Sequence, residues 1–147
     1  MNKWVLILGC STGHGGATAK RLAKDGYGII GFHLDRGEVK KEAELLKEEI
    51  SKINNGNVFF WNINAASVDV MDEYIPKISE ITNGQPLKLL LHSIAFGTTT
   101  NFFSEKPVNQ KQMDMTIHVM GNSLLYWTQK LYNIKLLGEG SRILGLT

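Results

Sequence analysis

The sequence predicts an α/β fold of the doubly wound type, a parallel five-stranded sheet with helices on both faces. Short runs that are apolar at nearly every position alternate with longer segments of helical spacing. Runs of this kind suit strands buried on both faces, as in parallel sheets. Parallel strands need crossovers, and right-handed crossovers favour three α/β/α layers with strand order 3-2-1-4-5.

The first strand, residues 4–8, leads directly into a glycine-rich turn. An amphipathic helix is expected to begin at Ala17, which leaves no room for a conventional loop. Gly9, Gly13 and Gly15 lack side chains that would block close approach, and the first amides of a helix are unpaired with a partial positive charge behind them. The turn could therefore hold a phosphate; an ordinary tight strand-to-helix turn is the alternative.

The remaining elements follow from periodicity and from turn residues. Strands are expected over residues 28–33, 58–61, 87–92 and 141–147, and helices over residues 38–53, 68–81 and 110–132. Pro76 lies inside the second of these helices and is expected to bend or shorten it. The helix over 110–132 is apolar round much of its circumference, which predicts burial against the sheet and against something else, such as a second subunit. The loop over 93–107 is long, and long loops in compact domains are often functional.

Composition limits the function classes. The chain has 147 residues, a net charge of +2 and one cysteine, which fits one domain over residues 1–147 and gives no electrostatic reason to expect nucleic acid or a membrane as partner. No apolar run approaches the roughly 18 residues of a membrane span, and no signal peptide is evident. Because Cys10 is the single cysteine of the sequence, an internal disulfide is ruled out, which suits a cytoplasmic location. Cys10 is expected to be a packing residue and not a nucleophile. No cluster of residues has metal-ligand spacing.

The predicted topology brings the glycine turn and residues 92–96 to one edge of the sheet, where doubly wound folds bind their ligands. Asp35 and Arg36 follow the second strand. A carboxylate there would bind the ribose hydroxyls of NAD and an arginine would favour the phosphate of NADP, so the cofactor stays NAD or NADP, and the two residues could equally be a solvent-facing pair.

Three histidines have open roles. His14 could touch a pyrophosphate or simply be exposed. His92 is expected to be structural or to pack beside the nicotinamide rather than to act as an acid. His118 is expected to be a hydrogen-bonded core or interface residue.

These motifs carry a family resemblance. The spacing Gly9-x-x-x-Gly13-x-Gly15 resembles the fingerprint of the short-chain dehydrogenase/reductase superfamily. Asn64-Ala65 stands where that family contacts adenine, and Ser93-Ile94-Ala95 stands where many members have Asn-Asn-Ala-Gly. The run Leu-His-Ser-Ile-Ala-Phe over 91–96 is similar to the enoyl-acyl-carrier-protein reductase branch. The resemblance implies a Rossmann-like domain whose cofactor-binding residues are Gly9, Ser11, Thr12, Gly13, His14, Gly15, Gly16, Asp35, Arg36, Asn64, Ala65, Ser93, Ile94 and Ala95.

The chain departs from the family pattern in two places. Met120 aligns with a position where many members have a catalytic Asn, which favours the enoyl reductase branch, although Asn122 is close. The resemblance covers only the front half of such an enzyme. The catalytic Ser and the Tyr-x-x-x-Lys of many relatives are expected to be absent, and the run Tyr126-Trp127-Thr128-Gln129 is not assigned to that motif. No catalytic residue is therefore assigned, and these residues alone are expected to be inactive and prone to associate.

The resemblance implies an NAD(P)H-dependent reductase. The first interpretation is a part of an enoyl-acyl-carrier-protein reductase that reduces an α,β-unsaturated acyl thioester in fatty acid synthesis, with acyl carrier protein as partner and a homo-oligomeric assembly. A second is another short-chain reductase acting on a carbonyl or an alcohol, such as a 3-oxoacyl reductase. A third is a non-catalytic nucleotide-binding module.

Overall fold

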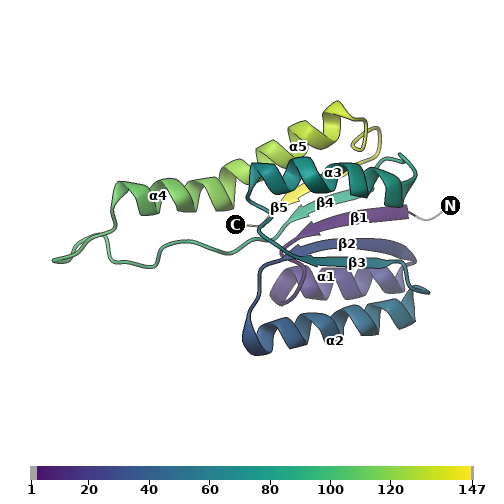
Figure 1. The fold of residues 1–147 in the computed structure, drawn as a ribbon, viewed down its shortest axis with the longest axis horizontal. Helices are drawn as coiled ribbons and strands as arrows, with labels where there is room; N and C mark the ends of the chain where they lie inside the picture. Colours follow the sequence, from purple (N-terminus) through teal and green to yellow (C-terminus); the bar gives the residue numbers. More distant parts are fainter. Residues whose placement is uncertain (1–2, 147) are drawn as a thin grey trace.

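The computed structural model describes residues 3–146 and contains one five-stranded parallel sheet in the order β3-β2-β1-β4-β5, as the sequence predicts (Figure 1). The sequence alternates strands with helical crossovers, which is why every neighbouring pair is parallel. The strands are β1 (Lys3–Leu8), β2 (Tyr27–His33), β3 (Val58–Asn62), β4 (Leu89–His92) and β5 (Arg142–Gly145).

Helices cover both faces of the sheet (Figure 1). One face carries α1 (Gly13–Lys24) and α2 (Gly37–Ile53), and the other carries α3 (Val68–Thr82) and α5 (Ser123–Asn133). Each face has its own apolar cluster. Side chains such as Phe32 and Trp127 pack under α3 and α5, whereas Ile29 and Ile50 belong to the cluster under α1 and α2. The three-layer architecture follows from strands that present apolar residues to both sides.

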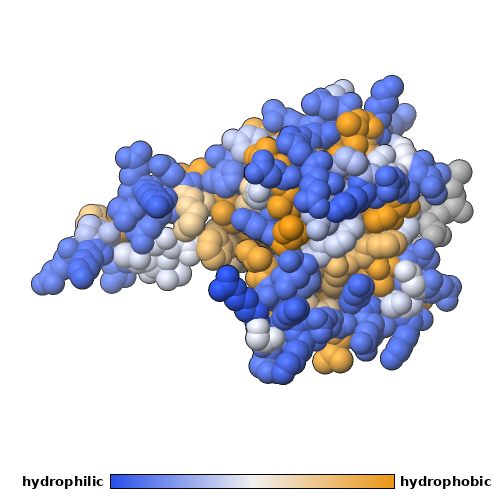
Figure 2. Space-filling view, in the orientation of Figure 1, coloured by the Kyte–Doolittle hydropathy of each residue, from blue (hydrophilic) through white to orange (hydrophobic). Residues whose placement is uncertain are grey.

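The long predicted helix is divided into three parts. An α-helix, α4 (Gln110–Ile117), is followed by a π-helical segment, η1 (His118–Asn122), and then by α5. The segment 93–109 and α4 project from the body as an arm (Figure 1). No residue of α4 is buried, so its burial on two sides, which the sequence predicted, does not occur among the described residues. Figure 2 shows the arm as largely hydrophilic, with apolar atoms where it joins the body.

Several boundaries differ from the sequence prediction. Helix α1 begins at Gly13, not Ala17, because the helical hydrogen bonds already start with the Gly16 amide donating to the Thr12 carbonyl at 3.0 Å. Helix α3 continues past Pro76 to Thr82, so proline does not shorten it. Strand β4 begins two residues later than predicted, and β5 ends at Gly145; Thr147, the predicted last strand residue, lies outside the described residues.

None of the helices that the structure describes is long and apolar enough to cross a membrane.

Candidate functional site

The glycine turn is fixed to the ends of two strands. The amides of Gly9 and Cys10 both donate to the Phe32 carbonyl at the end of β2, at 2.9 and 3.0 Å. Gly9 has φ +87°, and a Cβ there would lie 2.3 Å from the Ser93 carbonyl oxygen. Only glycine fits this left-handed position against a neighbouring backbone.

Gly15 serves close packing within the turn. A Cβ on Gly15 would lie 1.7 Å from the Gly9 carbonyl oxygen, so the first turn of α1 rests directly on the end of β1. Gly15 was predicted to permit close approach to the turn. In the structure, the group that approaches Gly15 closely is the backbone of Gly9. A side chain at this position would push the helix away from the strand.

The start of α1 is open. Thr12 is the N-cap residue with φ −141°, and its side chain makes no capping hydrogen bond. Thr12, Gly13 and His14 are exposed, and nothing lies within 4 Å of a Cβ built on Gly13. The first amides of the helix therefore lack a side-chain cap and lie beside exposed residues. This arrangement favours the binding of an anion at the N-terminus of α1.

The segment after β4 lies against the turn. The Ser93 amide donates to the Leu8 carbonyl at 2.7 Å, and the Ser93 carbonyl is the group that a side chain on Gly9 would strike. Ser93 and Ile94 are half-buried and Ala95 is exposed. The fold thus brings residues 9–16 and 93–95 together, as the predicted strand order requires.

Asp35, two residues after β2, makes three hydrogen bonds, one with His33 of β2 and two with Asn62 of β3. The Asp35 carboxylate accepts from Nδ1 of His33 at 2.8 Å. The Asp35 amide donates to Oδ1 of Asn62, and Nδ2 of Asn62 donates to the Asp35 carbonyl, both at 2.9 Å. Asp35 is half-buried whereas Arg36 is exposed, so the two do not form the solvent-facing pair that was one alternative.

Asn64 and Ala65 follow β3 and are fixed by backbone contacts. Oδ1 of Asn64 accepts from the Ala66 amide at 3.0 Å. The carbonyl of Ala65 accepts from Nε1 of Trp127 at 2.7 Å, and that of Ala66 accepts from Nε2 of His118 at 2.8 Å. His118 is therefore a hydrogen-bonded structural residue, which is one of its two predicted roles.

His92 is buried at the end of β4. Its Nε2 lies 2.8 Å from Oγ of Ser123, and that hydroxyl donates to the Val119 carbonyl at 2.7 Å. Because the hydroxyl has one proton to give, Nε2 of His92 is the donor in this contact. Burial lowers the pKa of His92, so the ring is held neutral in a structural contact.

Cys10 is buried, and burial raises the pKa of its thiol. A Cβ on Gly31 would lie 2.4 Å from the Cys10 sulfur, so the thiol packs directly on β2. The residue is a packing residue, as predicted, since a thiol held protonated is a poor nucleophile.

Lys130 stands four residues after Tyr126, so the letters Tyr-x-x-x-Lys do occur in the sequence, and the expectation that they are absent is wrong. Their position argues against a catalytic role. Nζ of Lys130 pairs with Asp72 of α3, and both motif residues line a hollow of about 570 Å³ with Val68, Gln129 and Asn133. That hollow contains none of the predicted cofactor-binding residues.

The positions aligned with the family's helix Asn, Met120 and Asn122, both lie in the π-helical segment and both are exposed.

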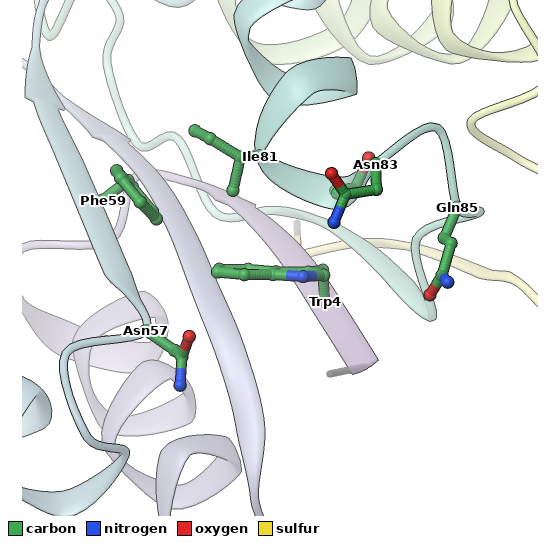
Figure 3. A pocket seen from close by; sticks show the side chains of 7 residues that line it. Trp4, Asn57, Phe59, Ile81, Asn83 and Gln85 are labelled. Carbon is green, nitrogen blue, oxygen red and sulfur yellow. The ribbon is translucent and has the colours of Figure 1, made fainter. Parts of the chain in front are cut away.

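A further pocket of about 360 Å³ lies away from the glycine turn, at the start of β1. It is lined by Trp4, Asn57, Phe59, Ile81, Thr82, Asn83 and Gln85 (Figure 3). Trp4 and Phe59 lie near one another, with ring centroids 5.9 Å apart. None of the predicted site residues lines this pocket, and no group of three or more His, Cys, Asp or Glu that could hold a metal occurs among the described residues.

Sequence reasoning missed His33 and Asn62. His33 and Asp35 lie two residues apart, and that spacing puts strand side chains on one face, which was a usable signal. Asn62 is 27 residues from Asp35, and only the pairing of β2 with β3 brings it there.

Comparisons with known proteins agree with this geometry. The family described as short chain dehydrogenase matches residues 3–145, whereas no curated protein matches the chain. Among solved structures, a Serratia marcescens short-chain dehydrogenase/reductase has a TM-score of 0.76 at 19% identity, covering 96% of this chain and 53% of its own.

Two other solved structures are similar. A 3-oxoacyl-[acyl-carrier protein] reductase from Brucella melitensis has a TM-score of 0.74 at 15% identity, covering 97% of this chain and 53% of its own. YwfH, described as an NADPH-dependent reductase involved in bacilysin biosynthesis, has a TM-score of 0.79 at 18% identity, covering 97% and 57%. The chain thus spans about half the length of these structures. By its match over residues 3–145, the chain belongs to the short-chain dehydrogenase family.

Proposed function

We propose that this chain is the nicotinamide-dinucleotide-binding part of an NAD(P)-dependent reductase. The observation that carries the proposal is the meeting of the open α1 N-terminus, the fixed Asp35 and the Ser93 backbone at one sheet edge. The similar structure of ElxO was solved with NADP bound, which supports the same class of ligand.

The residues present fit such a cofactor. The uncapped amides at the start of α1 would bind the diphosphate, and the glycines would let it approach the backbone. Asp35 would accept hydrogen bonds from ribose hydroxyls, and Asn64, which is exposed two residues after β3, would lie beside the adenine. A reduced nicotinamide bound at this site would supply a hydride, and the residues of the site would bind and orient the cofactor.

The diphosphate position is tested by Thr12→Asp in the purified chain, with NAD⁺ and NADP⁺ titrated by calorimetry. Asp is a good N-cap, so the substitution should keep or raise stability by up to about 1 kcal/mol. The carboxylate would occupy the free amides and repel the diphosphate, so the Kd should rise at least about tenfold.

The matched control is Asn109→Asp, which adds the same charge at the N-cap of α4 on the arm. It should leave both dissociation constants unchanged. Unchanged binding by Thr12→Asp would place the diphosphate elsewhere, and failure of the wild-type chain to bind either dinucleotide would refute the proposal.

For the substrate we propose an α,β-unsaturated acyl thioester, on the basis of the run His92-Ser93-Ile94-Ala95-Phe96 and of Met120. A carbonyl substrate is the second candidate, because a similar structure is a 3-oxoacyl reductase. Oxidation of NAD(P)H by the complete protein with crotonyl or acetoacetyl thioester distinguishes the two. Turnover of acetoacetyl thioester alone would favour the second.

We also propose the acyl carrier protein as the partner of the complete protein and a homo-oligomer as its assembly. A pull-down tests binding of the acyl carrier protein, and sedimentation tests the assembly.

A further inference from the structure

The Asp35 carboxylate is held more firmly than its place in a loop would suggest. The backbone amide and carbonyl of Asp35 are both bonded to the Asn62 side chain, and one carboxylate oxygen is bonded to His33. The side chains of His33 and Asp35 are only 7% and 17% exposed. A carboxylate has no proton to donate, so Nδ1 of His33 carries the proton in this contact.

His33 is itself held in place. Its ring packs against Phe60 at a centroid distance of 6.1 Å, and its carbonyl accepts from the Ile63 amide at 2.8 Å. The imidazole therefore has little freedom to follow the carboxylate elsewhere. It fixes the position of Asp35 rather than adapting to it.

The held carboxylate is close to the glycine turn. Burial raises the pKa of the Cys10 thiol, and the charge of Asp35 adds to that increase. Cys10 and the end of β2 are joined through the Phe32 carbonyl. Asp35 is thus fixed relative to the turn in which the proposed diphosphate lies.

We propose that His33 is a positioning residue for cofactor choice: by holding Asp35, it makes the chain prefer NAD(H) to NADP(H). This inference rests on the proposed dinucleotide site. A fixed carboxylate accepts hydrogen bonds from two ribose hydroxyls and repels a 2′-phosphate. Oδ2 is bonded to His33, which leaves Oδ1 for the ribose.

Arg36 is the opposing group. It is exposed and makes no salt bridge with any described residue, so it is free to pair with a 2′-phosphate. Without the bond from His33, the carboxylate could turn toward solvent or toward Arg36, and the repulsion at the ribose would weaken. Loss of the hydrogen bond from His33 should therefore change the preference between NAD(H) and NADP(H) and not the affinity for both dinucleotides together.

The experiment is calorimetric titration of the purified full chain with NAD⁺ and NADP⁺. Wild type should bind NAD⁺ more tightly. His33→Leu removes the donor and should narrow the ratio of the two dissociation constants by about tenfold, mainly through tighter NADP⁺ binding. His33→Asn keeps an N–H near the position of Nδ1 and should restore the ratio to within about threefold of wild type.

Three results would overturn the inference: a wild-type preference for NADP⁺, equal weakening of both dinucleotides by His33→Leu, or no rescue by Asn. If His33→Leu does not fold, nitrogen NMR of the wild-type imidazole decides, because an unprotonated Nδ1 cannot hold Asp35. Binding of neither dinucleotide by wild type would instead refute the proposed function, so the two failures are distinguishable.

Discussion

At the residue scale, burial sets the chemistry of His92. The ring is 1% exposed and donates to Ser123, whose hydroxyl is already committed to the Val119 carbonyl. A proton on the second ring nitrogen would bring a charge into this site without a counter-ion, so the folded protein opposes protonation. The neutral imidazole, with its proton on Nε2, is therefore the form that the folded protein favours in the contact between β4 and the start of α5.

This predicts a pH dependence of stability. The folded-state pKa of His92 lies below the ordinary value of 6.5, so the unfolded chain binds the proton more readily. The contribution of neutral His92 to the free energy of unfolding is fully present above pH 6.5. It is lost as the pH falls below that value, by at most about 1.4 kcal/mol per pH unit. Urea unfolding of wild type at pH 7.5 and 5.5 should show the loss, and His92→Gln should reduce it.

His14→Gln is the control, because His14 is exposed at the start of α1. It should leave the pH dependence as in wild type. The assignment to His92 fails if His92→Gln loses as much stability between the two pH values as wild type does.

The site residues that could be predicted from the sequence are those whose residue type and position after a strand already indicate a role. Gly9, Gly15 and Asp35 stand where a strand must end and a backbone or a ligand must approach, and the structure places all three at the sheet edge. His33 and Asn62 were missed because their importance comes from a contact with Asp35, and the residue types alone do not specify it.

At the element scale, the segment from 110 to 133 shows where periodicity is insufficient. Apolar residues at helical spacing correctly predicted helix throughout, but the five residues of η1 are π-helical. The π-turn sits where His118 bonds to Ala66 and where Ser123 meets His92, so tertiary hydrogen bonds accompany the change of helix type. Such contacts lie outside what a local pattern contains.

Pro76 leads to an element-scale prediction. It lies exposed inside α3, where its ring removes one backbone donor and crowds the preceding turn. Pro76→Ala should restore a helical hydrogen bond at an exposed site and raise the free energy of unfolding by about 1–2 kcal/mol, less than the full cost of proline because the unfolded chain gains freedom. Urea unfolding measures the change.

Lys77→Ala, at the next position of the same helix, is the control, because it introduces alanine without restoring a backbone donor. At the surface Lys77 pairs with Glu73, and its Nζ lies 4.0 Å from the centroid of the Tyr74 ring, so its replacement should lower the free energy of unfolding slightly and should not raise it. A Pro76→Ala variant that is no more stable than wild type would mean that α3 has already adapted its backbone to the proline.

At the scale of the whole molecule, the sheet was predictable and the arm was not. Apolar runs and crossover rules determine strand order, because a buried parallel sheet admits few alternatives. The projection of α4 has no local signature. Met113 and Ile117, four residues apart, look like part of a buried face in the sequence, yet they are 36% and 52% exposed. None of the described residues buries them.

The free edge of β5 gives the last prediction. Among the described strands β5 pairs only with β4, and its Ile143 and Leu144 are 44% and 51% exposed. An apolar edge strand is a template for pairing with another chain, so residues 1–147 alone should self-associate at micromolar concentration. Ile143→Lys should shift sedimentation toward the monomer, whereas Val39→Lys, the same change on exposed α2, should not. Monomeric wild type, or equal effects of both variants, would contradict association through this edge, because only Ile143 lies on it.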